Sequence, residues 1–442
     1  MLRSVFAAVI VALWASAASC TGTSGGDRDP AIVVSNVEPL LDEAISIKLT
    51  GMPPHEQVVL QLDLDFSGAR WVSRAAFTSD ASGRIDVGAQ APVSGDYTGI
   101  DGMGLFWSAR RQQPPLDHRA AERDRARLTA LVGDREAAST TLFRKRVGDG
   151  LTSQPVRHAG LVGTFYVPPG AGCHPAILVL GGSEGGLSGA ESQARLYASH
   201  GYAALALAYF DDNGLEQLPR RLFEIPFEYF LGALEWMRAQ PAVDPARIAV
   251  SGGSRGSEAA LWVAALDPGI KAVVAYAPSH VVWPALPTAQ GSAWSLRGEP
   301  LPYVPYPSAG VMPSTSGAAP NALTPLFRAS LDNAGAAQDA ARIPIERSAA
   351  AVLLVSGRDD QLWPSSAMAE EIIDRLRRHG HTRPYSHLAY DEAGHALVVP
   401  YFPTTELSAS GGRALGGSVA GAARAAADHW PKVLRFLEQN LS

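Results

Sequence analysis

Two serines lie in Gly-x-Ser-x-Gly motifs, the pattern that places a nucleophilic serine at a sharp turn between a strand and a helix. The motif around Ser254 reads GGSRG and follows the apolar run RIAV, whereas the motif around Ser183 reads GGSEG and follows AILVL. A serine hydroxyl is a weak nucleophile and needs an adjacent base that a third group orients. In this architecture the acid and the base follow later strands, so the downstream residues decide between the two serines.

The downstream residues supply an acid and a base for Ser254. Asp359 and Asp360 follow the run AVLLVSG, and His395 comes later, after room for one helix and one strand. Three of the four residues around Ser254 are glycine, and the helical pattern SEAALWVAAL follows, whose positive end suits developing negative charge. We therefore predict Ser254 as the nucleophile and His395 as the base. The residues by themselves leave the acid open between Asp359 and Asp360.

Ser183 follows an early strand, where this architecture has the loop that binds the oxyanion. We predict that the backbone N–H groups of Ser183 and of Arg255, the residue after the nucleophile, bind the oxygen that becomes negative. Glu184, in the same loop, is expected to be solvated rather than catalytic. The sequence contains no His-Glu-x-x-His or paired-cysteine motif, so neither a metal nor another cofactor is predicted.

A covered parallel sheet is predicted to position these residues. Within residues 151–442 the apolar runs AILVL, ALALA, RIAV and VLLV are continuous, and helical patterns lie between several of them. Continuous runs are typical of strands buried on both faces. These residues therefore predict a doubly wound, mostly parallel sheet with helices on both sides.

Residues 31–150 have a different pattern, with short and partly alternating apolar runs that turn sequences separate. The pattern predicts a small antiparallel β-sandwich, with Trp71, Phe106 and Trp107 in its core. The charged stretch at 117–137 is interpreted as a connection or an exposed edge.

Residues 282–345 interrupt the alternation of apolar runs and helical patterns within 151–442 with many prolines, glycines and serines. A structureless loop of this length is rare inside a compact domain, so we predict an insertion over the site. Its aromatic residues either line an apolar pocket or pin the insertion to the body; they are Trp283, Trp294, Tyr303 and Tyr306.

The N-terminus resembles an export signal. Residues 1–20 have one arginine, an apolar run and then small residues, and the last four, AASC, are similar to a bacterial lipobox that ends at Cys20. With 21–30 as a tether, we expect a periplasmic or membrane-anchored lipoprotein, or alternatively a secreted protein cleaved after Ala18. The only membrane contact expected is the lipid anchor, and Cys173 would then have no disulfide partner. A net charge of −6 indicates no nucleic-acid partner.

Several segments resemble the acyl-CoA thioesterase and bile acid-CoA:amino acid N-acyltransferase family, over nearly all of the chain after the signal. In order, the segments are LLDEAISIKLTGMPP, GDYTGIDGMGLFWS, LVGTFYVPPG, HGYAALALAYF, FEYFLGALEWM, GRDDQLW, AGHALVVPYFP and GGSVAGAARAAADHWPKVLRFLEQNL. The resemblance implies an immunoglobulin-like domain over 31–150 and an α/β-hydrolase domain over 151–442.

The resemblance also implies the roles of single residues. The family's triad falls on Ser254, Asp360 and His395, and its aspartate stands three residues before a tryptophan, here Trp363, which favours Asp360. The conjugating transferases typically have cysteine as nucleophile, so serine resembles the hydrolases. The implied reaction is hydrolysis of an acyl thioester, a small-molecule substrate, through an acyl-serine and without a cofactor.

Export of the chain from the cytoplasm changes the expected substrate, because acyl-CoA is found inside the cell and should be scarce outside it. The alternatives are a carboxylic ester hydrolase of the cell envelope and an acyltransferase to an amine or alcohol. A third hypothesis is a binding module without catalysis on the same fold, which the complete set of Ser254, Asp360 and His395 disfavours.

Overall fold

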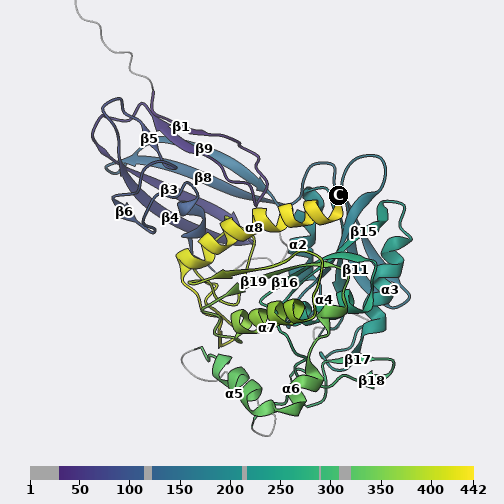
Figure 1. Ribbon diagram of the computed structural model, residues 1–442. Helices are drawn as coiled ribbons and strands as arrows, with labels where there is room; N and C mark the ends of the chain where they lie inside the picture. The colour runs from purple at the N-terminus through teal and green to yellow at the C-terminus, as the bar shows by residue number, and fades with distance from the viewer. Residues whose placement is uncertain (1–28, 114–121, 212–216, 288–289, 308–319) are drawn as a thin grey trace, which may run out of the picture.

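The computed structural model describes residues 29–442, except for 114–121, 212–216, 288–289 and 308–319. The described chain forms an N-terminal β-sandwich and a larger α/β part, and the final helix α8 (Val419–Leu441) crosses the boundary between them (Figure 1). The predicted signal, with Cys20, lies outside the described residues.

Two antiparallel sheets make up the N-terminal sandwich. One has the order β1-β2-β5, and the other has the order β6-β4-β3-β8-β9, with β7 paired to β4. The elements are β1 (Ala31–Val34), β2 (Ile47–Thr50), β3 (Gln57–Phe66), β4 (Ala69–Thr78), β5 (Ile85–Asp86), β6 (Ser94–Gly95), α1 (Gly104–Trp107), β7 (Arg110–Arg111), β8 (Arg123–Val132) and β9 (Arg135–Lys145).

Alternating side chains from both sheets form the core of the sandwich. Ile47 of β2 and Leu60 of β3 are fully buried in one cluster, as a sheet with one solvated face requires. Trp71, Phe106 and Trp107 belong to this cluster, which confirms their prediction as core residues.

The interpretation of 117–137 as a connection or an exposed edge is wrong for most of its length. β8 lies between β3 and β9 in the sheet, so it is an inner strand. Its arginines, at 123, 125 and 127, alternate with the buried Asp124, Ala126 and Leu128, so the arginine side chains occupy the outer face. Alternation of this kind marks a half-solvated strand rather than an edge.

An eight-stranded sheet with the order β10-β11-β13-β12-β15-β16-β19-β20 forms the centre of the second part. β10, β11 and β13 pair antiparallel, and the remaining pairs are parallel, which is the α/β-hydrolase arrangement. Its strands are β10 (Thr152–His158), β11 (Leu161–Val167), β12 (His174–Leu180), β13 (Ala203–Ala208), β15 (Val243–Gly253), β16 (Ile270–Tyr276), β19 (Ala351–Gly357) and β20 (Tyr385–Tyr390).

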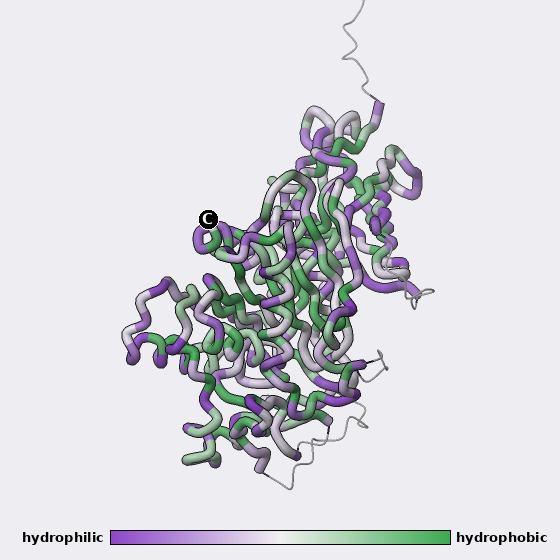
Figure 2. The backbone as a smooth tube through the Cα atoms, turned by 90° about the vertical axis from the view of Figure 1, so that its right-hand side faces the viewer, coloured by the Kyte–Doolittle hydropathy of each residue, from purple (hydrophilic) through white to green (hydrophobic). Residues whose placement is uncertain are grey.

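Helices cover both faces of this sheet. Ile177 packs in one cluster with α2 (Ser188–Ser199) and α8, while its neighbour Leu178 packs in another with α3 (Phe227–Arg238), α4 (Arg255–Leu266) and α7 (Ser365–Arg378). Because both faces are covered, the strands are apolar throughout, and hydrophobic segments gather in the middle of the molecule (Figure 2). None of the helices within the described ranges is long and apolar enough to cross a bilayer.

The segment at 282–345 carries its own short elements where the structure describes it. They are β17 (Trp294–Leu296), β18 (Glu299–Pro300), α5 (Thr324–Ala334) and α6 (Ala336–Ala341). Outside this segment, β14 (Ile225–Pro226) precedes α3. The small pair β21 (Ala409–Ser410) and β22 (Arg413–Ala414) follows later in the chain. Trp283 and Trp294 are fully buried, so they pin the segment to the body. Tyr306 instead lines a cavity beside Ser254.

Candidate active site

Ser254 lies at the sharp turn between β15 and α4. Its backbone has φ 53° and ψ −120°, a conformation that costs free energy for any residue with a Cβ. The flanking glycines allow the turn to close. A Cβ on Gly252 would collide with the carbonyl of Gly256, and a Cβ on Gly256 would collide with that of Gly181. The turn projects the serine from the carboxyl end of the sheet.

His395 joins Ser254 to a buried carboxylate. Its Nε2 is 2.9 Å from Ser254 Oγ, and its Nδ1 is 2.9 Å from Asp360 Oδ2. Asp360 follows β19 and His395 follows β20, so two adjacent strands bring the acid and the base to the serine. The geometry allows proton transfer from the serine hydroxyl to the imidazole, which the carboxylate orients.

The two neighbouring aspartates have different surroundings. The Asp360 side chain is 1% exposed, and its Oδ1 accepts hydrogen bonds from the backbone N–H groups of Leu362 and Trp363. The Ser365 hydroxyl donates to its Oδ2. Asp359 is exposed and accepts the N–H of Gly417. Only Asp360 contacts the histidine, in the position that the family resemblance favours.

The Gly-rich loop after β12 lies against Ser254. Ser183 and Arg255 both line a small cavity that also reaches Ser254. Glu184 is exposed, in agreement with its prediction as a solvated residue, and its carboxylate accepts the N–H of Gly182 at 2.9 Å. Because that bond fixes the loop, Glu184 helps to shape the site without contacting Ser254 Oγ.

Two cavities meet at Ser254. The larger has a volume of about 490 Å³ and is lined by His395, by the loop after it, and by Phe66 and Arg146 of the N-terminal sandwich. The smaller has a volume of about 90 Å³, includes Arg413 among its lining residues and does not reach His395. Ser254 thus lies between two cavities of different size.

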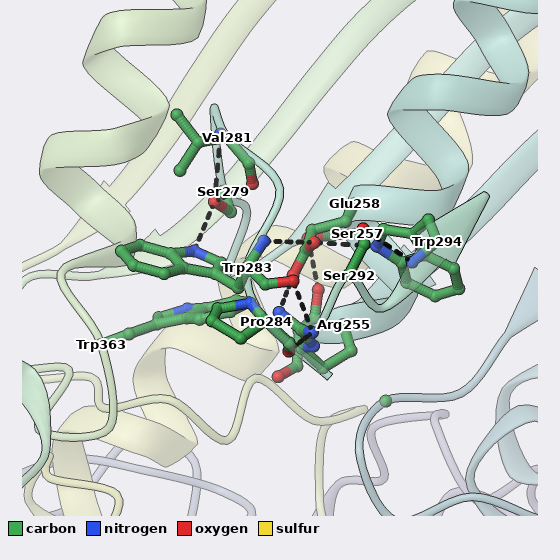
Figure 3. A network of polar contacts seen from close by, with 12 residues as sticks. Arg255, Ser257, Glu258, Ser279, Val281, Trp283, Pro284, Ser292, Trp294 and Trp363 are labelled. Atoms are coloured by element: carbon green, nitrogen blue, oxygen red, sulfur yellow. Dashed lines mark hydrogen bonds and ion pairs between the residues drawn. The ribbon is translucent and has the colours of Figure 1, made fainter. Parts of the chain in front are cut away.

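A buried ion pair lies beneath the nucleophile turn. Arg255 Nη1 is 2.6 Å from Glu258 Oε1, and the two side chains are 5% and 0% exposed. Glu258 Oε2 accepts hydrogen bonds from the Trp283 backbone N–H and the Trp294 indole, while Arg255 Nη2 donates to the Trp283 and Pro284 carbonyls (Figure 3). Burial raises the pKa of Glu258, although Arg255 and the hydrogen-bond donors lower it. The pair ties α4 to the segment at 282–345.

The sequence patterns predicted the residues that lie around Ser254 but did not predict others that line the cavities. Glu258 had one available signal, since it is a charged residue in an otherwise apolar helix, SEAALWVAAL. No sequence signal pointed to Arg413 or Phe66. Arg413 lies in the two-residue strand β22 and Phe66 in the ordinary strand β3, both far along the chain from Ser254. Among the described residues, no group of three or more His, Cys, Asp or Glu side chains is arranged to hold a metal ion.

Two family models match the chain. One is described as BAAT / Acyl-CoA thioester hydrolase C terminal and matches residues 225–442. The other is described as Acyl-CoA thioester hydrolase/BAAT N-terminal region and matches residues 42–158.

Curated relatives match over most of their length. The peroxisomal succinyl-coenzyme A thioesterase of Mus musculus is 30% identical, with 90% of this chain and 94% of the relative covered. The acyl-coenzyme A thioesterase 1 of Homo sapiens is 29% identical with the same coverage. The bile acid-CoA:amino acid N-acyltransferase of Homo sapiens is 30% identical, with 93% of this chain and 97% of the relative covered.

Among solved structures, a dienelactone hydrolase-like promiscuous phosphotriesterase from metagenomic libraries matches with a TM-score of 0.41 and 19% identity, covering 66% of this chain and 99% of its own.

Proposed function

The chain belongs to the acyl-CoA thioesterase and bile acid-CoA:amino acid N-acyltransferase family and is a thioester hydrolase with the α/β-hydrolase fold, and we propose that it acts through an acyl-serine intermediate on Ser254. The observation that carries the proposal is the hydrogen-bonded series from Ser254 through His395 to Asp360. A nucleophile, a base and an orienting carboxylate in that order are the parts that acyl transfer needs.

In the first half-reaction, Ser254 Oγ attacks the thioester carbonyl carbon while His395 Nε2 takes the hydroxyl proton. The backbone N–H groups of Arg255 and Ser183 stabilise the oxyanion. When the tetrahedral intermediate collapses, the carbon–sulfur bond breaks and the imidazolium returns its proton to the sulfur. The products are an acyl-serine and a free thiol.

In the second half-reaction, His395 takes a proton from water, and the hydroxide attacks the acyl-serine carbonyl. Collapse releases the carboxylic acid, and the proton passes back to Ser254 Oγ. Asp360 stabilises the imidazolium in both halves. An amine or alcohol in place of water would give the transferase reaction, and an oxygen ester in place of the thioester would give the esterase reaction by the same steps.

We also propose that the chain is exported, either as a periplasmic or membrane-anchored lipoprotein through Cys20 or as a secreted protein. The support is the pattern of residues 1–20. Under this proposal, envelope thioesters and carboxylic esters join acyl-CoA as candidate substrates. Fractionation of the expressed full-length chain tests it, and recovery in the cytoplasm at its full precursor mass would contradict it. The immunoglobulin-like relationship of residues 31–150 stays a prediction.

The test of the mechanism is a pair of serine variants assayed with acyl-CoAs and p-nitrophenyl esters. We expect Ser254→Ala to lower kcat by roughly 10⁴-fold or more, as loss of a nucleophile does in serine hydrolases. We expect Ser183→Ala to retain activity within about tenfold, since only its backbone N–H is used.

A fluorophosphonate probe supplies a second readout of the nucleophile. The probe should label the wild-type protein and the Ser183→Ala variant, and should fail to label Ser254→Ala. Labelling of Ser254→Ala, or inactivity confined to Ser183→Ala, would overturn the assignment. Offering amines or alcohols and measuring conjugates beside free acid separates hydrolysis from acyl transfer.

A further inference from the structure

Tyr209 contacts the loop that carries one of the two proposed oxyanion donors. It directly follows β13, which lies beside β12 in the sheet, and the Gly-rich loop follows β12. The Tyr209 hydroxyl is 2.7 Å from the carbonyl oxygen of Gly181 and 3.2 Å from that of Gly182, and it donates to both. A tyrosine hydroxyl has one proton, so the two carbonyls share it, and Gly181 is the nearer acceptor. Both carbonyl oxygens therefore face Tyr209.

The direction of these carbonyls fixes the direction of the N–H groups that follow them. Neither the Gly181–Gly182 nor the Gly182–Ser183 peptide bond is cis. In a trans peptide unit, the C=O of one residue and the N–H of the next point to opposite sides of the chain. The Ser183 N–H therefore points away from Tyr209.

The two N–H groups of this loop differ in their partners. The Gly182 N–H donates to the Glu184 carboxylate at 2.9 Å. Among the described residues, no backbone carbonyl accepts a hydrogen bond from the Ser183 N–H. Tyr209 and Glu184 thus hold both ends of the first peptide unit and the carbonyl end of the second. The Ser183 N–H is the end that they leave available.

This N–H belongs to a peptide unit that packs against Ser254. A Cβ on Gly182 would be 3.3 Å from Ser254 Cβ. Gly182 lines the larger cavity, Ser183 lines the smaller one, and Ser254 lines both. Tyr209 lines neither cavity. It therefore lies behind the loop and acts on the site through the loop, without touching a substrate.

Buried aromatic residues fix Tyr209 in turn. Its side chain is 3% exposed, and its ring packs against Phe230 and Trp294, with centroid distances of 5.4 and 5.6 Å. The Trp294 indole donates to Glu258, which binds Arg255, the residue with the other proposed donor (Figure 3). One buried network therefore supports both donors. Burial also raises the pKa of Tyr209 well above its usual value, so the hydroxyl keeps its proton and remains a donor.

We propose that Tyr209 is a positioning residue for the oxyanion: its hydroxyl holds the Gly182–Ser183 peptide unit so that the Ser183 N–H stays directed at the oxygen that becomes negative. This inference rests on the proposed function, because it needs an oxyanion that forms on a Ser254 adduct. Donors fixed in advance stabilise developing charge without reorganisation during the reaction, and a misplacement of about 1 Å can lower the rate by about 10²-fold.

The first test compares turnover with substrate binding in Tyr209→Phe, which keeps the ring and removes only the hydroxyl. The kcat should fall roughly 10- to 100-fold, as misplacement of one oxyanion donor would do. The KM should change little, because the lost interaction stabilises the transition state rather than the bound substrate. Titration of active sites with a fluorophosphonate gives kcat per competent site, so a partly unfolded variant does not obscure the result.

An alkyl trifluoromethyl ketone supplies a readout that a merely structural role would not change. Ser254 Oγ adds to its carbonyl carbon, the serine proton passes to His395, and the ketone oxygen becomes an oxyanion. In Tyr209→Phe, the inhibition constant of the ketone should rise by about the factor by which kcat/KM falls, as for a transition-state analogue. The corresponding trifluoromethyl carbinol has no carbonyl to attack, so its inhibition constant should stay the same.

Tyr166→Phe is the matched control. Tyr166 is also 3% exposed, its hydroxyl accepts a hydrogen bond from Arg195, and it lines neither cavity. The control removes a buried tyrosine hydroxyl away from the Gly-rich loop. It should leave kcat and both inhibition constants at their wild-type values.

Failure of this inference can be distinguished from failure of the proposed function. If Tyr209→Phe leaves the inhibition constant of the ketone unchanged, or weakens ketone and carbinol equally, the inference is overturned while the mechanism at Ser254 stands. If thioesters are not cleaved, the ketone still tests the loop. If fluorine NMR shows no ketone adduct on wild-type Ser254, both the proposed mechanism and the inference are contradicted.

Discussion

At the scale of single residues, burial and hydrogen bonding distinguish Asp360 from its neighbour Asp359. Asp360 is buried and accepts hydrogen bonds from the Leu362 and Trp363 N–H groups, the Ser365 hydroxyl and His395, whereas Asp359 is exposed. These hydrogen bonds fix the position of the Asp360 carboxylate against the His395 ring, as an orienting carboxylate requires. The chemistry that distinguishes the two aspartates therefore comes from their surroundings rather than from their residue type.

This difference predicts unequal effects of removing each charge. Asp360→Asn should lower kcat by about 10⁴-fold, because an amide at this position favours the wrong histidine tautomer and does not stabilise the imidazolium. Asp359→Asn should keep kcat within a few fold. Initial rates with an acyl-CoA and with a p-nitrophenyl ester measure both, and circular dichroism melting controls for folding. A variant pair with the opposite ranking would reassign the acid to Asp359.

At the scale of elements, α4 has two tasks in the site. Its first residue follows the nucleophile, and its buried Glu258 holds both Arg255 and the two tryptophans of the 282–345 segment. The wall of the smaller cavity is therefore attached to the same helix turn that presents Ser254. Movement of this segment would change the smaller cavity and the turn at Ser254 together.

Glu258→Gln should destabilise the protein by about 3–5 kcal/mol, because it leaves the buried Arg255 charge without compensation. The double variant Arg255→Met with Glu258→Gln should cost less than the sum of the two single changes, since neither charge then remains. Urea unfolding of the four proteins measures the coupling free energy. Glu438→Gln, at an exposed position of α8, is the control and should stay within about 0.5 kcal/mol. Additive single effects would show that the pair is not coupled.

At the scale of the whole molecule, the N-terminal sandwich forms part of the larger cavity beside Ser254. The tip of the β3–β4 hairpin brings Phe66 to the larger cavity. The Phe66 ring stacks on the Phe402 ring with 5.5 Å between the ring centroids, and Arg146 Cζ lies 4.7 Å from the Phe66 centroid. Asp42, which accepts hydrogen bonds from His200 and the Trp430 indole, joins the two parts nearby. Residues from both parts thus line the larger cavity.

Phe66→Ala should therefore affect large leaving groups more than small ones. An aromatic contact contributes about 0.5–1.5 kcal/mol in addition to the burial of its surface area, so its loss should raise the KM for an acyl-CoA severalfold. The kcat for the matching p-nitrophenyl ester should stay within about twofold, because the nucleophile and base are untouched. Steady-state kinetics with both substrates provide the comparison. An equal loss on both would indicate a general structural role for Phe66.

Much of the second part could be predicted from the sequence because its signals are local. Continuous apolar runs mark strands covered on both faces, and the glycines around Ser254 mark a turn that side chains would block. The inner position of the charged strand β8 was not predicted, because alternating arginine and alanine is a weaker strand signal than a continuous apolar run. Such a strand is nevertheless normal inside a sheet with one solvated face.

The sequence by itself determined the chain order of Ser254, the pair Asp359 and Asp360, and His395, and the strands that precede them, because these depend on residue type and local period. Only the tertiary structure decided that Arg413 and Tyr306 share a cavity with Ser254, and that Phe66 of the sandwich lines the other cavity. Such contacts join segments far apart in the chain and leave no periodic trace in either one. They arise from packing, so they become visible only when the sheet, the insertion and the sandwich are assembled.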